Sequence, residues 1–158
     1  MMPLALRSAL LIAGTLVALT SCEAVGVTGP GSETRAQMLS QRQLWESQGI
    51  TSYRYGYRRA CFCGDVNALE IDVANGAVAA ARYADDGAPV TSIYQSTLPT
   101  IDDLFDIIEE ALDSRADALR VTYHPTLGYP TEISVDYRFV VADDEFGYAI
   151  SNLILLPQ

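Results

Sequence analysis

The chain has 158 residues, of which 49% are hydrophobic and 19% charged, with 20 acidic against 10 basic residues. This length suits one domain, and the apolar content is enough for a packed core, which argues against a disordered chain. The net charge of −10 argues against nucleic acid and anionic lipid surfaces as partners, because both would repel the protein.

The N-terminal residues 1–21 have the pattern of a secretory leader. Arg7 supplies the positive region, and Ser8 to Ala18 is an apolar run too short to span a membrane. The segment Leu19-Thr20-Ser21-Cys22 resembles the bacterial lipobox, in which a lipid is attached to the cysteine thiol and the leader is cut before it. We therefore expect a lipoprotein signal peptide over 1–21 and lipidation at Cys22. The alternatives are ordinary cleavage beside a chance cysteine, or an uncleaved anchor.

Lipidation at Cys22 predicts a protein held on the extracytoplasmic side of a bacterial cell envelope through its lipid. Glu23 follows the cysteine in place of the aspartate of an inner-membrane retention signal, which favours the outer membrane in a two-membrane cell. Residues 22–32 are rich in Gly, Ser and Pro and are expected to form a flexible tether. A single domain is expected over 33–158.

The first half of this domain predicts one helix and three strands. Ser32 can cap a helix over about 33–48, which ends at Gly49. Residues 51–59 alternate in polarity, which indicates a half-buried strand. Strands over 66–74 and 77–84 flank Asn75-Gly76, which is a strong hairpin signal because a type I′ turn needs positive φ at both positions.

The second half repeats this order of elements. Thr100 is expected to cap a helix with Asp103 at its third position. The helix has one continuous apolar face, made by Ile101, Leu104, Phe105, Ile108, Ala111 and Leu112. Strands are expected over 119–124, 133–141 and 146–156. The predicted fold class is α+β, in the order α-β-β-β-α-β-β-β, with two helices on one face of an antiparallel sheet of about six strands.

Several short motifs resemble a family of small bacterial secreted proteins and lipoproteins that has no assigned function. The resemblance spans about residues 40–150 and includes Tyr53-x-Tyr55, Cys61-Phe62-Cys63 and Gly128-Tyr129-Pro130. Tyr123-His124-Pro125 departs from it, since the family more often has an aspartate at the position of His124. The order of elements also resembles small periplasmic inhibitor-type and cystatin-like modules. These resemblances imply a fold class and no chemistry.

Cys61 and Cys63 are the main candidates for chemistry. In an extended strand their Cα atoms would be about 6.6 Å apart, near the upper limit of about 6.8 Å for a disulfide, so a bridge would need a bend at Gly64. Buried thiols, a strained disulfide, a redox pair activated by the preceding arginines, and a soft-metal site all stay open. Only His124 could add a nitrogen ligand to such a metal site.

The sequence contains no recognisable catalytic constellation. His124 is the only histidine, so neither a Ser-His-Asp nor a Cys-His arrangement can be built around it with any specificity. Tyr53, Tyr55 and Tyr57 could form an aromatic binding face, although packing against Trp45 and the second helix is the favoured interpretation. No resident metal or other cofactor is expected.

We therefore expect a membrane-anchored, non-enzymatic binding or interaction domain of the bacterial cell envelope. Its partners would be the membrane, through Cys22, and an envelope protein, but not nucleic acid. The first alternative is a thiol-based redox or soft-metal-binding protein that uses Cys61 and Cys63. The second is an inhibitor of an envelope enzyme.

Overall fold

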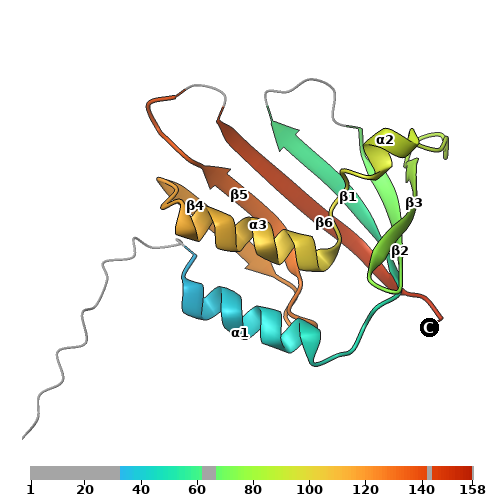
Figure 1. Cartoon of the computed structure of the whole chain (residues 1–158), viewed down its shortest axis with the longest axis horizontal. Coiled ribbons are helices and arrows are strands. Elements are labelled where there is room, and N and C mark those ends of the chain that lie inside the picture. Colours follow the sequence, from blue (N-terminus) through green and yellow to red (C-terminus); the bar gives the residue numbers. More distant parts are fainter. Residues whose placement is uncertain (1–32, 62–66, 142–143, 158) are drawn as a thin grey trace, which may run out of the picture.

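The structure is a computed structural model that describes residues 33–61, 67–141 and 144–157. A six-stranded sheet forms one layer, and two long helices lie together on one of its faces (Figure 1). The elements follow the order α1 (Arg35–Glu46), β1 (Tyr53–Cys61), β2 (Leu69–Ala74), β3 (Ala77–Tyr83), α2 (Ser92–Gln95), α3 (Ile101–Asp113), β4 (Ala118–Tyr123), β5 (Pro130–Asp136) and β6 (Glu145–Leu155).

The sheet joins two antiparallel three-strand units through the first and the last strand of the domain. The strand order is β3-β2-β1-β6-β5-β4, and every neighbouring pair is antiparallel. The hairpin between β2 and β3 has the expected turn, with φ of 51° at Asn75 and 76° at Gly76. The α+β class, the antiparallel sheet and its six strands are as predicted.

The long helices are capped by threonines. Thr34, and not the expected Ser32, caps α1, because its Oγ1 accepts a hydrogen bond from the Gln37 N–H at 3.2 Å. Thr100 and Asp103 form a reciprocal capping box at the start of α3, as predicted. The apolar face of α3 packs into the core with Leu104, Phe105 and Ile108 fully buried.

The structure differs from the predicted elements in two places. The short helix α2 was not predicted, since four residues are too few to show a helical period. The strand expected over 133–141 instead runs over Pro130–Asp136. Asp136 pairs with Glu145, so residues beyond Asp136 belong to the connection with β6. The apolar alternation that continues there leads to exposed side chains and not to a strand.

Candidate functional site

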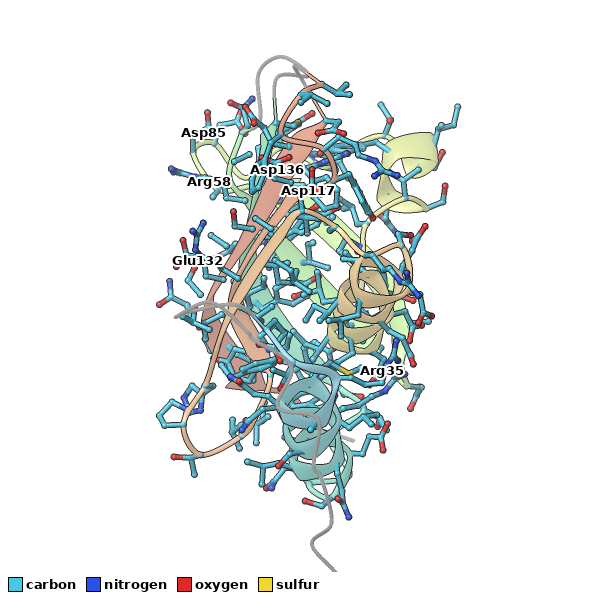
Figure 2. All side chains as sticks on the ribbon, turned by 90° about the vertical axis from the view of Figure 1, so that its left-hand side faces the viewer. Arg35, Arg58, Asp85, Asp117, Glu132 and Asp136 are labelled. Atoms are coloured by element: carbon cyan, nitrogen blue, oxygen red, sulfur yellow. The ribbon has the colours of Figure 1, made fainter. Side chains whose placement is uncertain are left out.

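Within the described residues, no element covers the face of the sheet opposite the helices. Seen with the sheet edge-on, Arg58 and Glu132 point away from the helices, whereas Arg35 lies on the helical side (Figure 2). Successive side chains of a strand point to opposite faces, so β1, β4, β5 and β6 each contribute alternate residues to this open face. The other residues of these strands point into the core.

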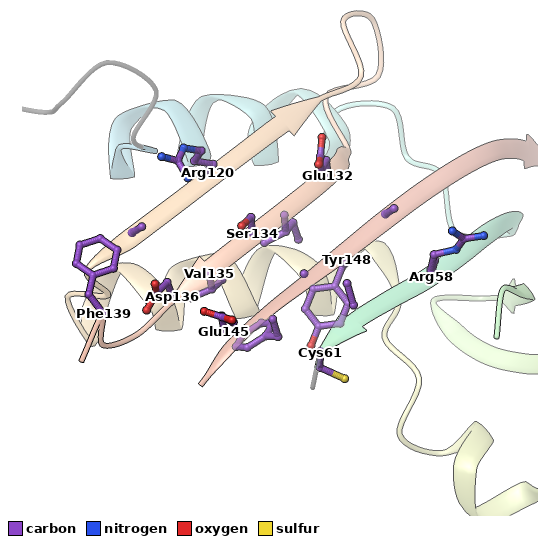
Figure 3. A pocket seen from close by; sticks show the side chains of 16 residues that line it. Arg58, Cys61, Arg120, Glu132, Ser134, Val135, Asp136, Phe139, Glu145 and Tyr148 are labelled. Atoms are coloured by element: carbon purple, nitrogen blue, oxygen red, sulfur yellow. The ribbon is translucent and has the colours of Figure 1, made fainter. Parts of the chain in front are cut away.

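Pairing between the strands brings open-face residues into rows that cross the sheet. Arg58 on β1 and Glu132 on β5 both pair with Ala149 on β6. In the next row, Ala60 and Ser134 both pair with Gly147, and Arg120 follows on β4. In these rows β6 therefore carries only the small residues Gly147 and Ala149, and the charged Arg58 and Glu132 stand on the strands to either side of it. Figure 3 shows both charged side chains at the groove.

These rows line a groove of about 590 Å³, which we call the open-face groove. Its lining is Arg58, Ala60, Cys61, Ala118, Arg120, Glu132, Ile133, Ser134, Val135, Asp136, Phe139, Glu145, Phe146, Gly147, Tyr148 and Ala149. A second hollow of about 400 Å³ continues over β1, β2 and β6 and shares Arg58 and Ala149 with the first. The uncovered face is thus hollowed across most of its width.

Two glycines in these hollows are also required by the sheet itself. A Cβ added at Gly56 would lie 2.6 Å from the Ser151 Oγ, and one at Gly147 would lie 3.1 Å from the Ile133 carbonyl oxygen. Gly56 follows Arg54 at a register shift between β1 and β6. The absence of a side chain at both positions allows the strands to pack closely. It also leaves no side chain projecting from these positions into the hollows.

The charges of the open face differ between its two halves. Near β2, Arg54 donates to Asp72, with Nη2 and Oδ2 3.0 Å apart, and Arg82 bridges Glu70 at 2.8 Å. The hydrogen bonds from Arg54 lower the pKa of Asp72 below its usual value. In the groove, by contrast, neither Arg58 nor Arg120 has an ion-pair partner within the described ranges. Those two guanidinium groups are available to a ligand.

The candidate cysteines can be placed only in part. Cys61 is half-buried at the end of β1, pairs in register with Phe146 and lines the groove. Cys22 and Cys63 lie outside the described residues. β4 begins at Ala118, which lies at the end of the sheet where Cys61 is found. His124 comes directly after the last residue of β4. His124 therefore lies at the opposite end of the sheet and cannot add a nitrogen ligand to a metal held by Cys61.

His124 stabilises a turn. Its Nδ1 accepts hydrogen bonds from the N–H groups of Thr126 at 3.3 Å and Leu127 at 3.1 Å, and its ring stacks on Tyr129 with the centroids 4.9 Å apart. The imidazole of His124 thus stabilises the connection between β4 and β5, directly after the last residue of β4.

The tyrosines of β1 form part of the core and are not available as a surface binding face. Tyr53, Tyr55 and Tyr57 are 1%, 0% and 5% exposed, respectively. Trp45 packs edge-on against Tyr53 with the ring centroids 5.5 Å apart, and the Tyr53 hydroxyl accepts from the Ile101 N–H at the start of α3. Burial raises the pKa of all three phenols.

The described residues contain no group of three or more His, Cys, Asp or Glu side chains that could hold a metal ion. In the same part of the chain, no helix is long and apolar enough to cross a membrane.

Most of the groove residues were not singled out from the sequence. A signal for them exists in β6, where Gly147, Ala149 and Ser151 occupy every second position with larger side chains between them. Alternation of small with large residues indicates a strand with one open side. This alternation does not show which residues of β1 and β5 lie beside β6.

A known protein family matches most of the chain. The model of a family described as "Family of unknown function (DUF6174)" matches residues 37–155. No curated protein and no solved structure matches the chain. The match covers the helices and the strands that form the open-face groove.

Proposed function

Because the chain belongs to the DUF6174 family, whose function is unknown, we propose a function from its geometry: a lipid-anchored envelope protein that binds a partner protein in the open-face groove. The observation that carries this proposal is the sheet itself, which is covered by helices on one face and hollowed on the other. The proposed function is binding alone, without a catalysed reaction.

The form of the groove favours a protein over a small molecule. Small-molecule sites are usually enclosed and bury most of the ligand surface. Here two adjoining hollows of about 590 and 400 Å³ lie on an uncovered sheet face and share Arg58 and Ala149. A low floor of small side chains lets a projecting loop or helix of a partner approach the backbone closely.

Charges around the groove supply the means of recognition. Arg58 and Arg120 lie on its β1 and β4 sides, and the acidic Glu132, Asp136 and Glu145 also line it. Groups of both signs at fixed positions favour a partner with a complementary pattern, and they set its orientation more than its affinity. A partner that is an envelope enzyme would make this protein an inhibitor if the bound segment came from the active-site rim.

Anchoring is supported by the leader and by Leu19-Thr20-Ser21-Cys22. In this proposal the lipid on Cys22 keeps the domain in the envelope, where it meets its partner. The predicted tether up to residue 32 would then join the lipid to the domain predicted from residue 33 onward.

A groove-blocking substitution tests the binding proposal. Ala149→Arg places a long side chain on the floor of the groove, and Ala36→Arg places the same side chain at an exposed position of α1, on the helical side. Both proteins are isolated from envelopes after chemical cross-linking. We expect Ala149→Arg, but not Ala36→Arg, to lose the adduct that the wild type forms. Equal yields from both variants would contradict binding in the groove.

A second candidate function is thiol chemistry at Cys61 and Cys63. The observation that favours it is the position of Cys61 in the lining of the groove, at the end of β1. A disulfide or redox pair at this end would act on a molecule bound in the groove. Titration of free thiols in the purified protein, with and without reductant, tests for a disulfide or redox pair. A thiol titre that reductant does not change would contradict this second candidate function.

A further inference from the structure

Three consecutive apolar side chains are exposed in the connection between β5 and β6. Phe139 is 69% exposed, Val140 is 92% exposed and Val141 is 49% exposed. Single exposed apolar residues are normal on a soluble surface, but adjacent ones indicate an interaction site. We call Phe139–Val141 the apolar tip. It belongs to residues 137–141, the part of the predicted strand that the sheet does not include.

The apolar tip lies beside the point where the N-terminal segment joins the domain. The Glu33 N–H donates a hydrogen bond to the Leu119 carbonyl oxygen at 3.0 Å. The Phe139 N–H donates to an Asp117 carboxylate oxygen, also at 3.0 Å. The first described residue and the apolar tip are therefore attached to the same three-residue stretch, 117–119.

The distance from this point to the proposed lipid is short. Ten residues, 23–32, separate Cys22 from Glu33. Fully extended they would reach about 35 Å, and as a flexible coil they would span about 16–19 Å on average. A lipid on Cys22 would thus hold the 117–119 stretch, and the apolar tip beside it, close to the bilayer surface.

We propose that the apolar tip inserts into the lipid interface of the membrane that carries the anchor. This inference rests on the proposed lipidation of Cys22. Apolar side chains at the interface would add a second contact with the bilayer to the one made by the lipid on Cys22. Since the lipid has already brought the tip to the surface, even weak insertion is favoured by the high effective concentration.

The charges near the tip select the kind of lipid. Arg138 precedes it, but Asp117, Asp136, Asp144 and Glu145 also lie at this end of the sheet, and the whole chain has a net charge of −10. Anionic headgroups would repel this surface. The expected partner is therefore a bilayer with zwitterionic headgroups.

Insertion would also orient the open-face groove. Phe139 lines one end of the groove, so that end would lie next to the bilayer. Leu155 is at the opposite end of β6, which starts at Glu145, about 33 Å away along the strand. A partner would have to enter the groove beside the membrane.

Quenching by brominated lipids tests the inference on the full chain. Lipidated protein is isolated from cells, its fatty acid is confirmed by labelling, and it is placed in phosphatidylcholine vesicles with or without bromine on the acyl chains. Val140→Trp reports on the apolar tip. Leu155→Trp is the matched control, because Leu155 is an exposed apolar residue, at 56%, at the other end of the sheet. The buried Trp45 reports in every variant that the fold is intact.

We expect brominated lipid to reduce the emission of Val140→Trp and to leave Leu155→Trp at the level of the wild type. Added anionic lipid should weaken the quenching. Lipidated protein in which neither variant is quenched, or both are quenched equally, would overturn the insertion while leaving the anchor in place. A blue shift of Val140→Trp without bromine quenching would assign the tip to a protein contact and would also overturn it. Protein that carries no fatty acid would remove the anchor and the inference with it.

Discussion

Arg58 and Glu132 face the same alanine from opposite sides. Both pair with Ala149, Arg58 from β1 and Glu132 from β5, so the Cα atoms of these oppositely charged residues lie about 10 Å apart with one short side chain between them. Figure 3 shows both side chains at the groove. No ion pair within the described part of the chain joins them. A ligand that binds between them can contact one charge on each side.

This relationship predicts the effect of charge reversal. Arg58→Glu and Glu132→Arg should each weaken partner binding about tenfold or more, since each places a repulsive charge at the groove. Because both residues are exposed, unfolding free energies should change by no more than about 0.5 kcal/mol. Quantitative cross-linking and thermal unfolding measure the two effects. Unchanged cross-linking in both variants would exclude a role for this row.

Lipidation is tested by Cys22→Ala. The substitution removes the thiol that would carry the lipid, so the leader should stay uncut and incorporation of labelled fatty acid should stop. Cys61→Ala controls for the loss of a cysteine and should keep both processing and label. Wild-type protein that takes up no fatty acid would contradict the anchoring proposal directly.

The core is tested by Ile108→Asp. Ile108 is fully buried on α3, and an unpaired carboxylate at this position should cost more than about 4 kcal/mol and abolish cooperative unfolding. Ile93→Asp makes the same change where the side chain is 80% exposed, and it should keep the wild-type transition. Calorimetry compares the two proteins. A native transition in Ile108→Asp would mean that α3 does not pack as the structure has it.

Glu33 predicts a pH dependence of stability. Burial raises the pKa of its carboxyl from 4.5 to about 6 in the folded protein, so folding favours the protonated form. This contribution is complete below pH 4.5 and is lost as the pH rises through about 6, at a cost of about 1–2 kcal/mol.

Glu33→Gln should therefore remove a loss of stability between pH 4.5 and 6 and should stabilise the protein at pH 8. Glu110→Gln on the exposed side of α3 is the control and should keep the wild-type profile. Urea unfolding across this pH range measures the effect. A wild-type profile in Glu33→Gln would show that another group titrates.

The cysteine pair should be nearly dispensable for folding. A bridge between Cys61 and Cys63 would close a three-residue loop, for which chain-entropy arithmetic gives only about 1.6 kcal/mol. Cys61→Ser with Cys63→Ser should thus cost about 1–3 kcal/mol in urea unfolding, mostly through lost burial. A double variant that cannot fold would show a far stronger structural role.

Local signals in the sequence account for most of the elements. Asn75-Gly76 and the capping box of Thr100 with Asp103 are short-range features, so their structures follow from the residues alone. Hydrophobic alternation located all six strands, but it failed after Asp136, because alternation does not show where a partner strand ends. The single turn of α2 was too short to give a period.

The candidate site depends on long-range pairing, which periodicity does not reveal. Alternation shows that Arg58 and Ala149 each face away from the core. It does not show that β1 pairs with β6, the last strand of the domain, and so brings the two residues together. For Tyr53 and Tyr55 the favoured interpretation was packing against Trp45 and the second helix, and the structure has both rings buried, with the Tyr53 hydroxyl bonded to the start of α3.

Site-specific photo-crosslinking in living cells tests whether a partner protein binds in the open-face groove. A benzophenone side chain is placed at Ala118 on the β4 side of the groove, at Ser134 on β5, and at Ala36 on the helical side, with the lipid anchor intact. Binding in the groove predicts the same protein adduct from Ala118 and Ser134, absent from Ala36, and lost when Arg58→Glu is added. Adducts from Ala36 alone, or the same adducts from all three positions, would contradict binding of a partner in the open-face groove.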